Sequence, residues 1–214
     1  MNRAWVILCV ILASYAVATL ACAAVRKRKR RCMDKSASEA MRLSAGAPAP
    51  MVASCGTLLG AVRAGAIVPD DDDVDLHVMP GDWDAVKDYV VDSYDRGTFR
   101  HVWRDGGTTL TLRCKGCGPL ASLDIYRIPE ASGTPPTYEF FGTRMSESSV
   151  APGDRVGFEG GELTGPRDPT SFLETMYGST WRTPRYLGKG NTKWRPIDVL
   201  HAIRRGGKKV GLYV

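Results

Sequence analysis

The sequence predicts an α+β domain preceded by a membrane-spanning helix, and three observations support this prediction. The segment from Ala4 to Val25 is continuously apolar or small, and crossing a bilayer takes about 20 such residues. Segments such as 73–78 and 120–128 alternate apolar and polar residues, which predicts strands. Segments such as 83–94 carry apolar residues at helical spacing. The 214 residues are enough for one domain with a hydrophobic core.

Six basic residues, 26–31, follow the apolar segment and account for the whole net charge of +6. No stripe of Lys or Arg interleaved with aromatic residues occurs elsewhere, so we do not expect nucleic acid as a partner. A cleaved signal peptide is the alternative, but its apolar core typically spans only about 7–15 residues. We therefore predict a single-pass signal-anchor at residues 1–32. The positive-inside rule would place the domain that follows in the cytosol.

A tether and one catalytic domain are predicted after the anchor, at residues 33–50 and 51–214. The tether is polar, with a short helix at 38–43, and Pro48 and Pro50 end it. In the domain we expect a short strand at 51–53 and a helical turn at 58–63 that Gly65 ends.

The remaining elements follow from caps and turn residues. Asp82 is expected to cap a helix that buries Trp83, Val86 and Val90. Two strands, 98–103 and 108–113, are expected to form a hairpin. A strand is expected at 120–128, and 129–166 reads as irregular apart from a strand at 138–141. A last helix should begin after Asp168, and Gly178 should end it.

Alternate positions of the acidic segment 70–75 carry carboxylates that should share one face of a strand. In an extended chain Asp71, Asp73 and Asp75 point one way, while Val74 and the apolar residues after it point into the core. Carboxylates held side by side repel one another, and a divalent cation relieves that repulsion. The segment therefore predicts a metal site for phosphate chemistry, with a solvated acidic loop as the alternative.

A calcium-binding EF-hand loop is excluded by the rest of this segment. That loop needs Gly at its sixth position and Glu at its twelfth. Counted from Asp71, the chain has Leu76 and Asp82 there.

Asp124 is a further candidate, because it lies between Leu123 and Ile125 in an expected buried strand. Burying a carboxylate is costly unless it is paired or binds a metal. Cys114 and Cys117 have half of a zinc-ribbon spacing, but no second pair completes four ligands. A local disulfide or two reduced thiols are therefore favoured over zinc.

Three ordered motifs resemble the LicD family, which includes fukutin and fukutin-related protein within the nucleotidyltransferase superfamily. The first is Gly56-Thr57-Leu58-Leu59-Gly60-x-x-Arg63 with the acidic strand after Pro69. The second is Leu123-Asp124-Ile125-Tyr126, and the third is the helix 168–177 continued through Trp181 to Pro184. Asp70 departs from the pattern, because the family commonly has an aromatic residue there. Together the motifs span roughly residues 50–185.

The resemblance implies a nucleotidyltransferase-like mixed β-sheet flanked by helices. It implies transfer of a phospho-alcohol or phospho-sugar, such as phosphocholine or ribitol phosphate, from a CDP-linked donor to a glycan acceptor. It also implies Mg²⁺ or Mn²⁺ as cofactor and an ER or Golgi membrane, which conflicts with the positive-inside rule.

The same resemblance suggests roles for single residues. Asp73 and Asp75 would be paired metal ligands, Asp71 a further ligand, and Asp124 a third ligand or the base that takes the acceptor proton. Backbone amides near Gly56 and Thr57 would hold the donor phosphate. Arg63 would pair with that phosphate, or else form a surface ion pair. Asp72 would be structural, and Tyr177 and Trp181 would be core and turn residues.

Three other functions remain open. A nucleotidyltransferase that moves the NMP itself would use the same carboxylates. An inactive, membrane-bound interaction module would be expected to have lost one of them. A metal-dependent glycosyltransferase with an Asp-x-Asp motif ranks lower, because that class does not require the Gly-Thr turn.

Overall fold

The computed structural model describes residues 3–69 and 71–183. The helices are α1 (Arg3–Gly46), α2 (Cys55–Ala64), α3 (Trp83–Ser93), α4 (Glu147–Val150) and α5 (Pro169–Tyr177). The strands are β1 (Val52–Ala53), β2 (Asp73–Val78), β3 (Phe99–Arg104), β4 (Thr109–Cys114), β5 (Ser122–Arg127), β6 (Thr137–Phe140), β7 (Thr143–Ser146), β8 (Pro152–Phe158) and β9 (Gly161–Pro166).

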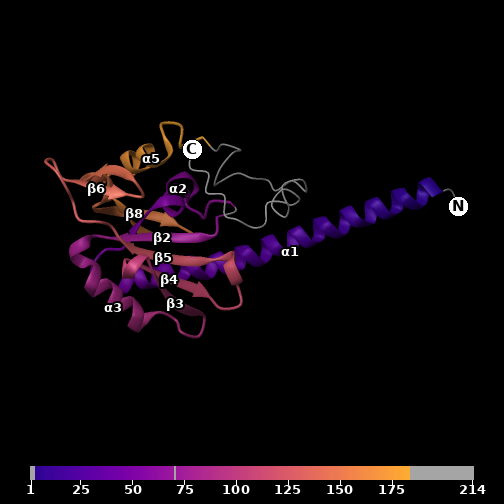
Figure 1. The fold of residues 1–214 in the computed structure, drawn as a ribbon, viewed down its shortest axis with the longest axis horizontal. Coiled ribbons are helices and arrows are strands. Elements are labelled where there is room, and N and C mark those ends of the chain that lie inside the picture. The colour runs from indigo at the N-terminus through magenta and orange to yellow at the C-terminus, as the bar shows by residue number, and fades with distance from the viewer. Residues whose placement is uncertain (1–2, 70, 184–214) are drawn as a thin grey trace.

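Within these residues, seven strands form one mixed sheet in the order β3-β4-β5-β2-β1-β9-β8. The β2–β5 and β1–β9 pairs are parallel, and the other neighbours are antiparallel. Helices α2 and α5 lie on one side of the sheet, and α1 passes along the other side (Figure 1). This arrangement confirms the expected α+β fold with a mixed sheet flanked by helices.

The core lies where strand alternation predicts it. On β2, Val74, Leu76 and Val78 are completely buried, and on β5 so are Leu123 and Ile125. Burying each such side chain contributes about 1.5–3 kcal/mol relative to leaving it exposed. This apolar face of the sheet holds β2 and β5 in place, so their other faces can present polar groups.

Residues 33–46 differ from the expected polar tether, because α1 runs through them without a break. Met33, Ala37, Ala40 and Leu43 recur at helical spacing and are at most 2% exposed. Glu39 is buried as well, and it accepts hydrogen bonds from the Arg42 side chain and from the backbone N–H of Asp95. One face of the segment therefore packs as a core helix, and its buried Glu39 is satisfied by a neighbouring side chain and a distant backbone group.

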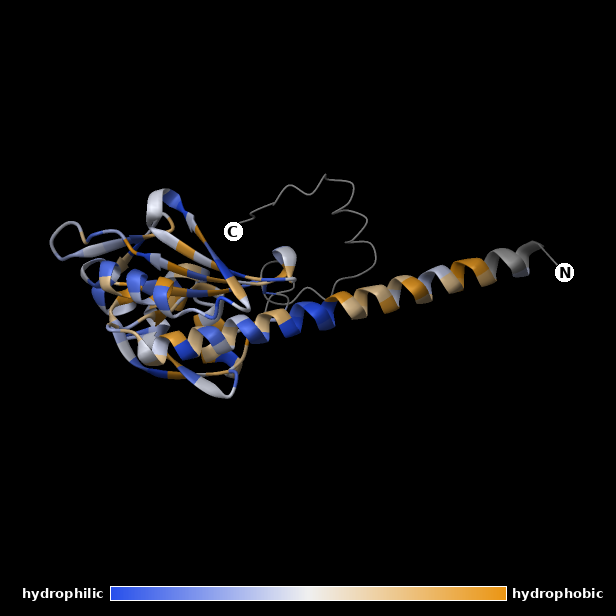
Figure 2. Cartoon of the chain, turned by 90° about the horizontal axis from the view of Figure 1, so that it is seen from below, coloured by the Kyte–Doolittle hydropathy of each residue, from blue (hydrophilic) through white to orange (hydrophobic). Residues whose placement is uncertain are grey.

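The N-terminal part of α1 projects from the domain with its apolar side chains exposed. Among the described residues, one helix is long and apolar enough to cross a membrane, and it includes this part. Figure 2 shows hydrophobic residues along the projecting helix, followed by a hydrophilic stretch close to the domain. Large side chains such as Trp5, Tyr15 and Leu20 are more than half exposed.

The segment 129–166 is more regular than expected, because it contains β6–β9. The predicted strand near residues 138–141 is present as β6, whereas β8 and β9 had no sequence signal. β9 begins with Gly161 and ends with Gly165 and Pro166, and both residue types are uncommon inside strands, so its sequence does not predict a strand. Hydrogen bonding to β8 and to β1, which is distant in sequence, stabilises β9 as a strand.

A disulfide joins Cys32 of α1 to Cys117 in the loop after β4. The expected choice between a local Cys114–Cys117 bond and two reduced thiols was therefore wrong. Cys114 is a buried free thiol whose Sγ lies 2.9 Å from the Sγ of Cys117. The correct partner is 85 residues away in sequence and becomes adjacent only through the packing of α1 against the sheet.

We predict that non-reducing peptide mapping of the full chain will link Cys32 to Cys117. Cys32→Ser should lower the free energy of unfolding by about 2–4 kcal/mol, because the bond closes a long loop in the unfolded chain. Cys114→Ser is the matched control and should keep the bond. Recovery of a Cys114–Cys117 peptide from the unmodified chain would contradict this pairing.

His77 is a completely buried histidine on β2. Its Nε2–H donates to the carbonyl of Val150 at 2.7 Å, and Nδ1 has no hydrogen-bond partner among the described residues. Burial lowers the pKa of His77 to about 4, because a proton on Nδ1 would find neither water nor an acceptor there.

We predict a loss of stability as the pH falls from 6.5 toward 4. In that window the unfolded state binds a proton at this histidine that the folded state refuses, so stability rises with pH. The loss should reach on the order of 3 kcal/mol near pH 4, measured by urea unfolding in detergent. His77→Phe should remove this contribution, whereas His101→Phe, at an exposed position, should retain it. Equal pH slopes for all three proteins would refute the assignment.

Candidate metal and phosphoryl-transfer site

Three carboxylates meet where β2 and β5 run side by side. The parallel register places Asp75 directly opposite Asp124, and Asp73 opposite Ser122. Carboxylate oxygens of Asp73, Asp75 and Asp124 lie within 4.8 Å of one another. The structure thus brings together three of the residues that the sequence singled out, and it does so on the face opposite the buried Val74 and Leu76.

Asp71 and Asp72 lie just before β2 rather than within it, because the strand begins at Asp73. The backbone N–H of Asp71 donates to the carbonyl of Val68 at 3.1 Å, which turns the chain at this point. Oxygens of Asp71, Asp72 and Asp73 form a second group within 4.8 Å. Asp73 belongs to both groups of carboxylates. Because Asp71 is buried and Asp72 is exposed, the second group extends from the sheet to the protein surface.

Asp124 is the most buried of the three converging carboxylates. Its Oδ2 accepts a hydrogen bond from Nη2 of Arg104, at the end of β3. Its Oδ1 is buried and has no hydrogen-bond partner among residues 3–69 and 71–183. The sequence did not predict that Arg104 contacts Asp124. β4 lies between β3 and β5, so this contact depends on the pairing of both strands with β4.

The start of α2 supports the acidic segment from the side. Oγ1 of Thr57 accepts a hydrogen bond from the backbone N–H of Asp75 at 2.8 Å. A Cβ on Gly56 would lie 2.1 Å from Oδ2 of Asp71, so only glycine allows the carboxylate to approach. In the structure Thr57 positions Asp75, and Gly56 leaves space for Asp71. Contact of Gly56 and Thr57 with a donor phosphate stays a prediction.

The turn from β1 into α2 is strained. Cys55 has a φ of +48°, in the left-handed region that non-glycine residues seldom adopt. The buried hydroxyls of Ser54 and Tyr126 bond to each other, and Sγ of Cys55 lies 3.5 Å from the Tyr126 hydroxyl. Burial raises the pKa of Tyr126 well above its usual value, so its hydroxyl remains protonated. These contacts hold the strained turn next to the carboxylates.

The sequence reasoning assigned Tyr177 to the core, and this side chain does pack against the hydrophobic core. Burial raises the pKa of its hydroxyl far above the usual value, and the charges of Asp75, Asp71 and Asp73 raise it further. The last residue of α5 is therefore within electrostatic range of the acidic cluster. Only its place in the third motif could have pointed to this. Trp181 is 3% exposed and packs in the core.

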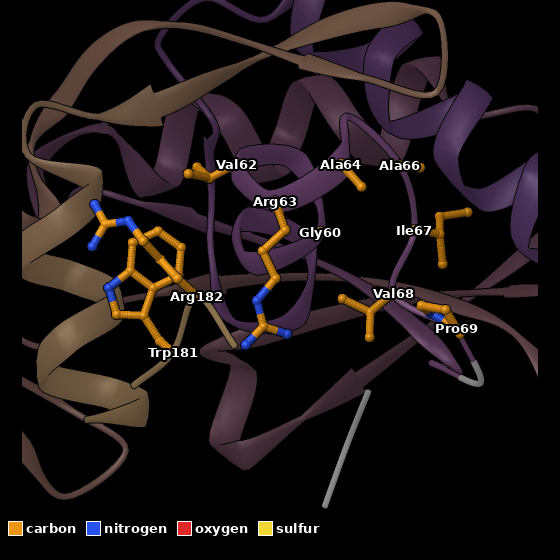
Figure 3. Close-up of a pocket in the computed structure, with 10 residues that line it drawn as sticks. All are labelled: Gly60, Val62, Arg63, Ala64, Ala66, Ile67, Val68, Pro69, Trp181 and Arg182. Carbon is orange, nitrogen blue, oxygen red and sulfur yellow. The ribbon is translucent and has the colours of Figure 1, made fainter. Parts of the chain in front are cut away.

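A cavity of about 450 Å³ opens beside α2 (Figure 3). Arg63, Val68, Pro69, Trp181 and Arg182 are among the residues that line it. The guanidinium of Arg182 stacks on the Trp181 ring at 4.2 Å, whereas Arg63 extends from α2 along the wall of the cavity. Desolvation lowers the pKa of Arg63, and Nε of Arg63 is buried with no hydrogen-bond partner among the described residues. An anion would satisfy this group.

Comparison with known proteins gives one family. Residues 49–168 match the family described as LicD/FKTN/FKRP, nucleotidyltransferase domain. No curated protein matches the chain. The matched segment is more than half of the chain, and it contains β2, β5, the start of α2 and all the converging carboxylates. The chain therefore belongs to the LicD/FKTN/FKRP family, whose members are generally transferases with a phosphotransferase- or nucleotidyltransferase-like role.

Proposed function

We propose that this protein is a membrane-anchored phosphotransferase. It would move a phospho-alcohol or phospho-sugar, such as phosphocholine or ribitol phosphate, from a CDP-linked donor to a glycan. The observation that carries the proposal is the convergence of Asp73, Asp75 and Asp124 on one face of the sheet, within a family of transferases. An inactive interaction module is disfavoured, because none of these carboxylates is lost and their oxygens lie close together.

Mg²⁺ or Mn²⁺ fits the groups that would hold it. The ligands on offer are carboxylate oxygens alone, which these hard cations prefer. The buried Oδ1 of Asp124 accepts no hydrogen bond from any described residue, which suits a metal ligand. When bound, the ion would neutralise the pyrophosphate of the donor. Asp73, Asp75 and Asp124 would hold it, and Asp71 would extend the site.

The partner of Asp124 favours one of its two expected roles. Oδ2 of Asp124 already accepts a hydrogen bond from Nη2 of Arg104. A carboxylate oxygen of Asp124 also lies within 4.8 Å of oxygens of Asp73 and Asp75. We therefore assign Asp124 to the metal-binding set rather than to proton abstraction.

Arg63 would bind the donor phosphate, because its buried Nε needs an acceptor and the cavity it lines reaches Val68 and Pro69, just before the acidic segment. Tyr177 interacts electrostatically with both Arg63 and the carboxylates. Since this hydroxyl stays protonated, it would donate a hydrogen bond to a bound phosphate oxygen and not act as a base. Binding at two points would orient the donor for in-line attack.

We place the domain on the lumenal side of an ER or Golgi membrane. The Cys32–Cys117 disulfide links the helix just outside the apolar segment to the domain. Disulfides form and persist in oxidising compartments and are rare in the cytosol. The disulfide therefore outweighs the basic residues 26–31, which favour the opposite orientation.

We predict that Mn²⁺ binds the full chain in detergent and that Asp73→Asn weakens this binding more than about tenfold. Altering groups that only orient metal ligands already costs about 10–100-fold. Isothermal titration calorimetry measures the affinity directly. Asp92→Asn, on the exposed side of α3, is the matched control and should bind normally. Wild-type affinity in both Asp73→Asn and Asp75→Asn would exclude this site.

With Mn²⁺, a panel of CDP-linked donors and a panel of glycan acceptors, the full chain should release CMP with one pair of donor and acceptor. Asp75→Asn should lower that rate about 100-fold or more, as does the loss of other electrostatic groups in active sites, while circular dichroism shows an unchanged fold. Mass spectrometry of the acceptor identifies the group transferred. A phospho-alcohol or phospho-sugar would support the proposal, and a bound CMP would instead establish nucleotidyl transfer. Undiminished release by Asp75→Asn would refute the assignment of the site.

A further inference from the structure

A second, basic cavity of about 510 Å³ lies at the β3–β4 edge of the sheet. Arg100 of β3, Arg113 of β4 and Lys115 line it together with the loop 114–119. Nothing in the phosphotransferase site uses these residues. The three cationic side chains are exposed at the surface.

The two arginines form a pair of like charges. Arg100 and Arg113 are direct cross-strand partners in the antiparallel β3–β4 ladder. Like charges directly opposite one another destabilise a sheet. Within residues 3–69 and 71–183, neither arginine nor Lys115 forms an ion pair, and Nζ of Lys115 donates only to the carbonyl of Arg96. An anion between the two strands would relieve this repulsion.

The loop that borders this basic cavity is attached to α1 at two points. Nη2 of Arg28 donates to the carbonyl of Gly116, and Cys117 is bonded to Cys32. Arg28 is three residues beyond the apolar segment, or about 5 Å along the helix axis. The headgroup layer on each side of a bilayer is about 5–7 Å thick. If α1 spans the membrane, the Gly116 loop lies at the depth of the lipid headgroups.

We propose that Arg100, Arg113 and Lys115 bind the phosphate of an anionic lipid in the membrane that α1 spans. The proposal rests on the anchoring of α1 and on no step of the transfer reaction. Three donors around one cavity suit a phosphate with several acceptor oxygens. The neighbouring basic residues 26–31 place further positive charge at the depth of the headgroups.

This lipid site would also orient the catalytic face. The register runs from Arg100 to Arg113, then to Ser122 on β5 and to Asp73 on β2. Cross-strand partners point to the same face, so the basic cavity and the carboxylates share one face of the sheet. Two strand spacings separate the Cα atoms of Arg113 and Asp73, or about 10 Å. A lipid held by the arginines would keep the metal site at a constant height above the bilayer.

The test uses the full chain in phosphatidylcholine nanodiscs that contain a photoreactive phosphatidic acid or a photoreactive phosphatidylcholine. We expect phosphatidic acid to label peptides that cover residues 96–119, and phosphatidylcholine not to. Arg100→Gln/Arg113→Gln should reduce the labelling about thirtyfold, since two surface cations are removed. Arg144→Gln/Arg167→Gln removes the same charge from exposed positions elsewhere and should label normally.

Equal labelling by both lipids, or normal labelling of Arg100→Gln/Arg113→Gln, would overturn the proposal. Loss of labelling in about 10 mM inorganic phosphate would overturn it in favour of a soluble phosphate ligand, because a lipid confined to the disc is present at far higher local concentration. Extraction of the chain from membranes by alkaline carbonate would refute the anchor and the lipid site together. An anchored chain that shows no lipid preference would refute the lipid site alone.

Discussion

The parallel pairing of β2 with β5 is the constraint on which the rest of the site depends. It places Asp75 opposite Asp124 and turns both carboxylates, with Asp73, away from a core that buries Val74, Leu76 and Leu123. A shift of one residue would turn these carboxylates into the core and the apolar residues toward the site. Apolar burial on one face therefore keeps mutually repelling charges together on the other.

The surrounding polar groups reduce the cost of this arrangement. Arg104 pairs with Asp124, Thr57 holds the backbone of Asp75, and Gly56 leaves room for Asp71. The strained Cys55 keeps the start of α2 close to the strand. Backbone strain of this kind persists when the surrounding packing over-determines it, and it concentrates at functional sites.

Helix α1 connects the apolar N-terminal segment to the sheet without a break. Its residues Met33, Ala37, Ala40 and Leu43 belong to the hydrophobic core, and its disulfide and Arg28 fix the loop after β4. Because one continuous helix contains both the apolar segment and a core element, the orientation of the domain relative to that segment follows from the helix.

Local periodicity was enough to predict the long apolar N-terminal segment, the hairpin of β3 and β4, the helix after Asp82 and the shared face of Asp73 and Asp75. Each of these features depends on residues that are close together in the sequence. Tertiary structure alone decided the Cys32–Cys117 bond, the Arg104–Asp124 pair, the position of Tyr177 and the burial of residues 33–46. These contacts join segments 20 to more than 80 residues apart, and no local pattern encodes which distant surface a side chain will meet. The strands β8 and β9 show the same limit, since pairing with β1 overrides their weak strand propensity.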